Sequence, residues 1–314
     1  MNTFQWNGTE VCTSHLTQMS FRAECCEFLV SVTPENQNQA LEAFRKGSNF
    51  SGLRVSGIAD LSFLADFPNL RYLEVVDQRR VNTRPIEGLS NLRGLRLETP
   101  GTGIDFSCFS ELEVFVGDWH IDNSNVHRCE ELRQLQVWQF KPKSLDLSDF
   151  ANTTRLEWLY LTQTGIASLA GLETLRDLRY CEIAYAPKLE SLEVLTSDRI
   201  ELRELSFRKA KKILSFEPIA ALRCLRRLNL FDCASMPDLK WINGMEQLDF
   251  FSFVGTNVED GDLSPLLNMP SLRYVGTSDR KHYNYKFTAI NELLSQRLEN
   301  VHRIKRLSRE RRSA

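Results

Sequence analysis

The sequence lacks any apolar run of the about 18 residues that would be needed to cross a bilayer. Its first twelve residues, MNTFQWNGTEVC, lack the basic-then-apolar order of a secretory signal. A net charge of −2 over 314 residues gives no excess of one sign that would favour binding to nucleic acid or to a membrane surface. We therefore expect a cytoplasmic protein that binds neither nucleic acid nor a membrane.

The sequence also has little that would support catalysis. Its five histidines form no obvious nucleophile–base pair, and it contains no Gly-x-Ser-x-Gly motif. The segment TPGTGIDF has two glycines, Gly101 and Gly103, but lacks the lysine and the following helix of a phosphate-binding loop. The sequence therefore predicts neither an enzyme nor a cofactor site.

A metal site is also disfavoured. The stretch DWHIDNSNVHRC gathers four potential ligands, but their spacing is not that of a standard zinc site and the repeat described below places them in a turn and a return segment: Asp118, His120, His127 and Cys129. The eight cysteines stand at irregular spacings, with only Cys25 and Cys26 adjacent. This pattern indicates reduced structural thiols rather than a disulfide framework.

What the sequence does contain is a repeat. The frame Leu-x-x-Φ-x-Φ, in which Φ is apolar, occurs in ten copies at intervals of 20–24 residues, with Gly117 and Thr277 as exceptions at the sixth position. The copies begin at Leu70, Leu92, Leu112, Leu132, Leu156, Leu178, Leu202, Leu225, Leu248 and Leu272. A partial earlier copy starts at Phe50. The frame predicts a strand, and the apolar residues that follow it at spacings of three predict a helical or 3₁₀ return segment. Because one such unit cannot close a core, the units must stack.

This pattern resembles the leucine-rich repeat family, specifically the 22-residue class of bacterial internalin-like proteins and phosphatase-regulating scaffolds. The resemblance covers residues 50–280 and implies an α/β solenoid, an arc with a parallel β-sheet on its concave face. The family often has Asn at the ninth position, where the side chain satisfies backbone groups in the turn, but this sequence has none there. We therefore expect irregular turns and uneven curvature, with the first four repeats bending differently from the later six.

The ends of a solenoid need caps, because an open end exposes the leucine core. We expect residues 1–49 to form an N-terminal cap, with a strand at ECCEFLVSVT (24–33) and a helix at ENQNQALEAFRKG. We expect residues 281–314 to form a C-terminal capping helix with a basic tail. Seven basic residues against two glutamates in 297–314 favour a frayed, soluble helix end over a binding arm.

Large aromatic residues occupy outward positions of the predicted strands. In LEWLYL (156–161) the leucines face the core, so that Trp158 and Tyr160 face outward. Aromatic residues and arginine are favoured in protein interfaces, which predicts a partner-binding site on the concave face. Rings that only stabilise the sheet by packing across strands are the alternative. The candidate partner-binding residues are Trp119, Trp138, Trp158, Tyr160, Tyr180, Tyr185, Arg208, Arg227, Phe231 and Phe250.

Basic residues follow the aromatic group along the sheet. Repeats seven and eight carry a basic sector beside Glu204 and Asp232, which predicts a partner with an acidic edge; its members are Arg203, Arg208, Lys209, Arg226 and Arg227. Arginine also holds the second position in seven of the ten repeats (71, 93, 133, 179, 203, 226 and 273). There, pairing with acids of adjacent repeats is favoured over contact with a partner.

The predicted function is non-enzymatic binding of another protein, a toxin or an enzyme, by a chain that is monomeric when free. The closing segment, residues 259–287, resembles that of a set of bacterial leucine-rich repeat proteins. With a one-domain layout, this favours inhibition of the partner, as by a bacterial immunity protein that neutralises a cognate toxin. A scaffold or regulatory subunit of a housekeeping enzyme is the alternative, and a secreted effector is a weaker one.

Overall fold

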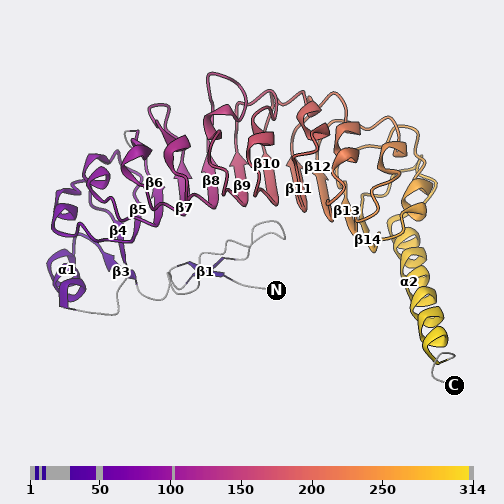
Figure 1. Ribbon diagram of the computed structural model, residues 1–314, viewed down its shortest axis with the longest axis horizontal. Helices are drawn as coiled ribbons and strands as arrows, with labels where there is room; N and C mark the ends of the chain where they lie inside the picture. The colour runs from indigo at the N-terminus through magenta and orange to yellow at the C-terminus, as the bar shows by residue number, and fades with distance from the viewer. Residues whose placement is uncertain (1–3, 7–8, 12–28, 47–51, 101–102, 311–314) are drawn as a thin grey trace.

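The computed structural model describes residues 4–6, 9–11, 29–46, 52–100 and 103–310. Within them, twelve strands form one parallel sheet in chain order, from β3 to β14. Figure 1 shows the strands along the inner side of an arc and the 3₁₀ segments along its outer side. The predicted solenoid with a concave parallel sheet is therefore confirmed. A short hairpin of β1 (Phe4–Trp6) and β2 (Thr9–Val11) forms a separate sheet.

The strands are short and evenly placed. Those of the sheet are β3 (Leu29–Val32), β4 (Gly52–Ser56), β5 (Tyr72–Val76), β6 (Gly94–Glu98), β7 (Val114–Asp118), β8 (Gln134–Trp138), β9 (Trp158–Thr162), β10 (Tyr180–Ala184), β11 (Glu204–Arg208), β12 (Arg227–Phe231), β13 (Phe250–Ser252) and β14 (Tyr274–Gly276). The ten predicted copies of the frame correspond to β5–β14. The partial copy corresponds to β4. The predicted cap strand, residues 24–33, corresponds to β3, and residues 24–28 of that prediction lie outside the described residues.

The return segments are 3₁₀ helices. They are η2 (Ser62–Asp66), η3 (Arg84–Gly88), η4 (Phe106–Cys108), η5 (Val126–Arg128), η6 (Ser148–Phe150), η7 (Leu172–Thr174), η8 (Glu193–Thr196), η9 (Glu217–Ala221), η10 (Lys240–Ile242) and η11 (Ser264–Asn268). Ile166, Leu169, Leu172 and Leu175, at spacings of three, are all buried, as are Leu159 and Leu161 of the facing strand β9. The continuous core therefore lies between the sheet and the 3₁₀ segments, as the frame predicts.

Both predicted terminal helices are present. Helix α1 (Gln37–Lys46) connects β3 to β4 and buries Ala40 and Leu41. Helix α2 (Phe287–Glu310) follows β14 and buries Ile290 and Leu294, and Figure 1 shows its distal part extending away from the arc. No helix within the described residues is long and apolar enough to cross a membrane. The boundaries 1–49, 50–280 and 281–314 stay a prediction, and residues 311–314 of the basic tail lie outside the described part.

The turns after the strands are more regular than predicted. In repeats four to nine the eighth position has a positive φ of 52–79°, at Gln139, Gln163, Tyr185, Lys209, Asp232 and Gly255. At the first four of these the backbone N–H donates to the carbonyl that ends the next strand, at 2.8–2.9 Å, and at Asp232 it donates to the Val254 carbonyl, just beyond β13, at 3.0 Å. The expectation of irregular turns is therefore wrong for these repeats, whereas the expected difference in bending between the first four repeats and the later six stays a prediction.

Side chains at the ninth position take over part of the role of the missing asparagine. The Thr164 hydroxyl donates to the Phe140 carbonyl at 2.9 Å, and the Thr256 hydroxyl donates to the Leu230 carbonyl at 2.6 Å. Thr256 also accepts a hydrogen bond from the backbone N–H of Cys233 at 2.9 Å. These bonds satisfy buried backbone groups, which would otherwise cost stability.

A β-branched residue at the eighth position should be poorly tolerated. We expect Gln163→Val to lower the free energy of unfolding by about 1–2 kcal/mol, because β-branched residues rarely adopt positive φ, and φ of Gln163 is 56°. Urea denaturation of the purified chain would measure the change. Gln163→Ala is the matched control, and an equal loss in that variant would attribute the effect to contacts of the side chain instead.

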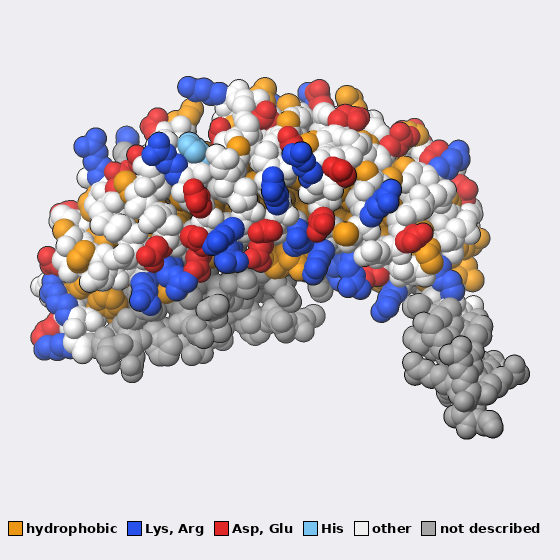
Figure 2. Space-filling model, viewed as in Figure 1, with side chains coloured by type: hydrophobic (Ala, Val, Ile, Leu, Met, Phe, Trp, Pro, Cys, Tyr) orange, Lys and Arg blue, Asp and Glu red, His pale blue; other side chains and the backbone are white. Residues whose placement is uncertain are grey.

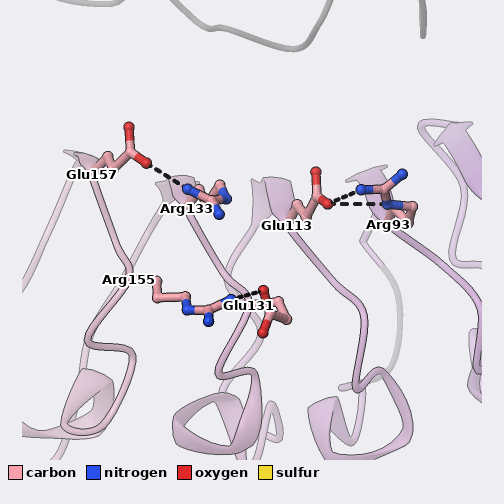
Figure 3. A network of polar contacts seen from close by, with 6 residues as sticks. All are labelled: Arg93, Glu113, Glu131, Arg133, Arg155 and Glu157. Atoms are coloured by element: carbon pink, nitrogen blue, oxygen red, sulfur yellow. Dashed lines mark hydrogen bonds and ion pairs between the residues drawn. The ribbon is translucent and has the colours of Figure 1, made fainter. Parts of the chain in front are cut away.

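Arginines of the second position form a row of ion pairs along one edge of the sheet. Arg133 bonds Glu157 at 2.8 Å, and Figure 3 shows this pair beside the equivalent Arg93–Glu113 pair. The third pair in Figure 3, Arg155–Glu131, also joins adjacent repeats, but Arg155 is not at the second position. Arg226–Asp249 and Arg179–Glu201 lie at 3.1 and 3.4 Å. Pairing between adjacent repeats is thus confirmed at four of the seven positions, whereas the ion pairs found among the described residues do not include Arg71, Arg203 or Arg273. In Figure 2 side chains of both signs alternate over this side of the arc.

Candidate functional site

The centre of the concave face carries a stacked pair of rings. Trp158 of β9 and Tyr180 of β10 are direct register partners, and their ring centroids lie 3.5 Å apart with planes inclined by 7°. Tyr160 follows two residues along β9 and lies opposite Glu182 of β10. All three rings are partly buried. The predicted juxtaposition of Trp158 and Tyr180 is therefore present in the structure.

Arginines alternate with aromatic rings on the strands that follow. The Arg208 guanidinium lies 5.3 Å from the centre of the Phe231 ring, and the Arg227 guanidinium lies 4.4 Å from that of Phe250. Phe250 in turn stacks on Tyr274 of β14 at 5.0 Å. Each contact joins equivalent positions of neighbouring strands, the third position for Arg227, Phe250 and Tyr274 and the seventh for Arg208 and Phe231. We call Trp158, Tyr160, Tyr180, Arg208, Arg227, Phe231, Phe250 and Tyr274 the concave row.

The two arginines of this row face buried glutamates. Arg208 Nε lies 3.4 Å from Glu182 Oε1, and Arg227 Nε lies 3.7 Å from Glu204 Oε2. The side chains of Glu182 and Glu204 are only 2% and 16% exposed. Arg208 and Arg227 therefore each have a carboxylate beside them, whereas the ion pairs among the described residues include neither Arg203 nor Lys209. The partner with an acidic edge stays a prediction.

Burial changes the acidity of both glutamates. It raises the pKa of Glu182 to about 7, against the opposing effect of Arg208. It also raises the pKa of Glu204 to about 7, with Arg227 lowering it and Asp249 raising it. Removing a carboxylate from water disfavours its charged form, and one nearby guanidinium offsets this only in part. Both carboxyls therefore titrate near neutral pH.

Trp119 does not join the concave row, and its predicted placement there is wrong. Its ring stacks on Phe106 at 5.8 Å and meets Phe140 and Phe150 edge-on at 5.3 and 5.8 Å. These phenylalanines are fully buried, so Trp119 packs against the core. Unlike the eighth position of later repeats, Trp119 has no positive φ. Gly117, at the sixth position of the same repeat, contributes no side chain to the core.

The other two predicted residues lie beside the row. Tyr185 is 46% exposed, and Lys209 Nζ lies 5.1 Å from the centre of its ring. Trp138 ends β8, opposite Thr162 of β9, and is partly exposed. The ring–ring contacts of the described residues include neither side chain. Sequence reasoning thus placed Tyr185 and Trp138 on the correct face, but not in the packed row itself.

A pocket opens on the concave face between β8, β9 and β10. The side chains that line it are Gln134, Gln136, Trp158, Tyr160, Tyr180 and Glu182. Gln136 and Glu182 were not predicted as site residues. The available signal was their fifth position, which puts them on either side of Tyr160 in the sheet. A polar residue at the fifth position indicates that the concave face of the sheet is not purely apolar.

The four potential metal ligands between 118 and 129 are not gathered. Cys129 is fully buried, its thiol contacts the Phe106 carbonyl, and burial raises its pKa to about 12. His120 Nδ1 instead accepts a hydrogen bond from the Asp122 N–H at 3.2 Å. Over the described ranges no three His, Cys, Asp or Glu side chains are grouped as a metal site would require. The cysteines at 108, 129, 181, 224 and 233 are free.

Comparison with known proteins relates this geometry to solved structures. No family model matches the chain, and no curated protein matches it. An internalin (InlF) of Listeria monocytogenes matches with a TM-score of 0.56 at 16% identity, over 74% of this chain and 76% of that one. Internalin C2 of the same organism gives 0.43 at 19% identity over 56% and 76%, and the mouse RP105/MD-1 complex gives 0.49 at 14% over 73% and 47%.

The repeat and the match to InlF agree on the architecture. Ten copies of the leucine frame form parallel strands, each followed by a return to the next, and the InlF match extends over three quarters of both chains. At this level of identity the similarity concerns the fold. By its fold, this chain is a leucine-rich repeat protein.

Proposed function

We propose that this protein binds another protein through the concave row, without catalysing a reaction. Leucine-rich repeat folds are generally protein-binding scaffolds. The observation that carries the proposal is the packing of aromatic and arginine side chains across the concave face, in the contacts Trp158–Tyr180, Arg208–Phe231 and Arg227–Phe250–Tyr274, where the fold does not require them. Such residues bury large areas at low entropic cost and are frequent hot spots of interfaces.

Inhibition of the partner is the finer form of the proposal. The resemblance of residues 259–287 to bacterial leucine-rich repeat proteins favours a cytoplasmic immunity protein that masks a cognate toxin. A scaffold or regulatory subunit of a housekeeping enzyme is the second candidate, and a secreted effector is the third. Immunity requires a toxin gene beside this gene, and it requires cells that lose this gene but keep its neighbour to die. A scaffold requires copurification with a housekeeping enzyme and no such toxicity.

The contact surface can be tested once the partner has been captured from native cells. We expect Trp158→Ala and Tyr160→Ala each to weaken binding at least about tenfold, since truncated interface hot spots cost about 2 kcal/mol or more. Isothermal titration calorimetry with the captured partner would measure this. Leu214→Ala, at a side chain that is 81% exposed but outside the concave row, is the control and should bind normally. Unchanged affinity in folded Trp158→Ala and Tyr160→Ala would refute the location of the site.

A further inference from the structure

The pocket between β8, β9 and β10 holds acceptor atoms that have no donor. Glu182 is 2% exposed, and neither of its carboxylate oxygens accepts a hydrogen bond. Gln136 Oε1, in the same pocket, is buried and also lacks a donor. Buried acceptors are normally satisfied, and an unsatisfied one needs an explanation. Three such oxygens around one pocket indicate a ligand that supplies N–H groups.

The walls of the pocket restrict the ligand further. Trp158 and Tyr180 stack face to face on each other, which leaves one face of each ring to offer, and Tyr160 adds a third aromatic side chain. A planar cation stacks favourably on such rings. A guanidinium also has five N–H donors in a fixed fork, which matches the two oxygens of a carboxylate. An ammonium ion has the charge but not this shape.

We propose that this pocket receives an arginine side chain of the bound partner protein, with the guanidinium donating to Glu182 and Gln136 and lying against the Trp158–Tyr180 pair. This inference rests on the proposed function, because it names the chemistry by which the concave row selects its partner.

Arg208 does not already fill this role. Its Nε lies 3.4 Å from Glu182 Oε1 but makes no hydrogen bond to it, and its side chain is 39% exposed and lies over Phe231 of the next strand. A carboxylate has about four acceptor positions, so that a second guanidinium can bind the same group. The side chains beside Glu182 on the neighbouring strands are Tyr160 of β9 and Ser206 and Arg208 of β11. None of them places a second negative charge there.

Short peptides test the inference on the full chain without the natural partner. The probes are acetyl-Gly-Arg-Gly-amide, its lysine analogue and its citrulline analogue, the last being a neutral isostere of arginine. Binding is followed at pH 8 through the indole N–H signal of Trp158 in protein labelled with ¹⁵N-tryptophan, assigned with Trp158→Phe. We expect saturable shifts with the arginine peptide and at least about tenfold weaker binding of the other two, the loss typical of one charged hydrogen-bonded pair.

Two glutamine variants locate the effect. Glu182→Gln should weaken binding of the arginine peptide about tenfold or more. Glu204→Gln should leave binding unchanged, because Glu204 lies outside the pocket although its pKa is raised to about 7 like that of Glu182. In the wild type, binding should strengthen from pH 6 to pH 8, because the pKa of Glu182 is about 7 and only its carboxylate pairs with the cation. Glu182→Gln should lose that dependence.

The outcomes separate this inference from the proposed function. Equal shifts with arginine and citrulline peptides, equal shifts with arginine and lysine peptides, or undiminished binding to folded Glu182→Gln would each overturn the arginine assignment. None of these results bears on whether Trp158→Ala weakens binding of the captured partner. If Trp158→Ala has no such effect, the proposed interface itself is wrong.

Discussion

Replacing Trp119 with alanine is expected to lower the free energy of unfolding by about 3–5 kcal/mol, the usual cost of truncating a tryptophan or phenylalanine in a core. The ring contacts three fully buried phenylalanines, and its loss would leave a cavity between neighbouring repeats. Chemical denaturation followed by circular dichroism would measure the loss.

Trp158→Ala is the matched comparison, because the same residue type is removed from the concave face. It should cost less stability, since the Trp158 ring stacks on Tyr180 on the concave face, whereas the Trp119 ring contacts three core phenylalanines. Partner affinity should respond in the opposite way, falling for Trp158→Ala and remaining unchanged for the Trp119→Ala protein that is still folded. A smaller loss of stability for Trp119→Ala than for Trp158→Ala would contradict the assigned roles.

The second large effect concerns pH. We expect the free energy of unfolding to fall as pH rises from about 5 to about 8. The pKa of Glu182 and that of Glu204 are each raised from 4.5 to about 7, so that in this range the folded chain holds protons that the unfolded chain has released. Stability falls with pH wherever the folded state binds more protons, by as much as about 3 kcal/mol for each carboxyl at the upper end.

The double variant Glu182→Gln, Glu204→Gln isolates this contribution. It should be more stable than the wild type at pH 8 and should lose most of the difference at pH 5, where the native glutamates are protonated in the fold. Denaturation midpoints across this pH range would establish it. Glu246→Gln, at an exposed residue, should leave the profile unchanged. A double variant less stable than the wild type at pH 8 would show that the two ion pairs outweigh the cost of burial.

The periodic part of the structure was accessible from the sequence because stacking imposes one local rule on every repeat. Each leucine of the frame must enter the shared core, so ten copies in register predict ten parallel strands and their side-chain directions. Trp158 and Tyr180 were therefore placed side by side without a structure. The two additional strands at the N-terminal end were harder to predict, because β3 and β4 keep the pairing but not the whole frame.

The sequence could not predict features that depend on how one repeat contacts the next. Trp119 enters the core beside a glycine at the sixth position, and no single-repeat pattern shows which side chain will take that space. Glu182 is at an outward position of its strand, yet its neighbours on both sides enclose it. Its burial, and therefore its altered acidity and the unsatisfied oxygens of the pocket, arises only when three strands are assembled.

The column of positive-φ residues after β8–β12 has a consequence for altering recognition. Five different positions, occupied by two glutamines, a tyrosine, a lysine and an aspartate, adopt the same backbone conformation. In all five the backbone N–H bonds to a carbonyl at or just beyond the end of the next strand, whereas the side chain differs. These five positions can therefore carry different side chains on the same backbone conformation. Substituting them with other unbranched residues would change the surface that the arc offers to a partner while keeping the fold.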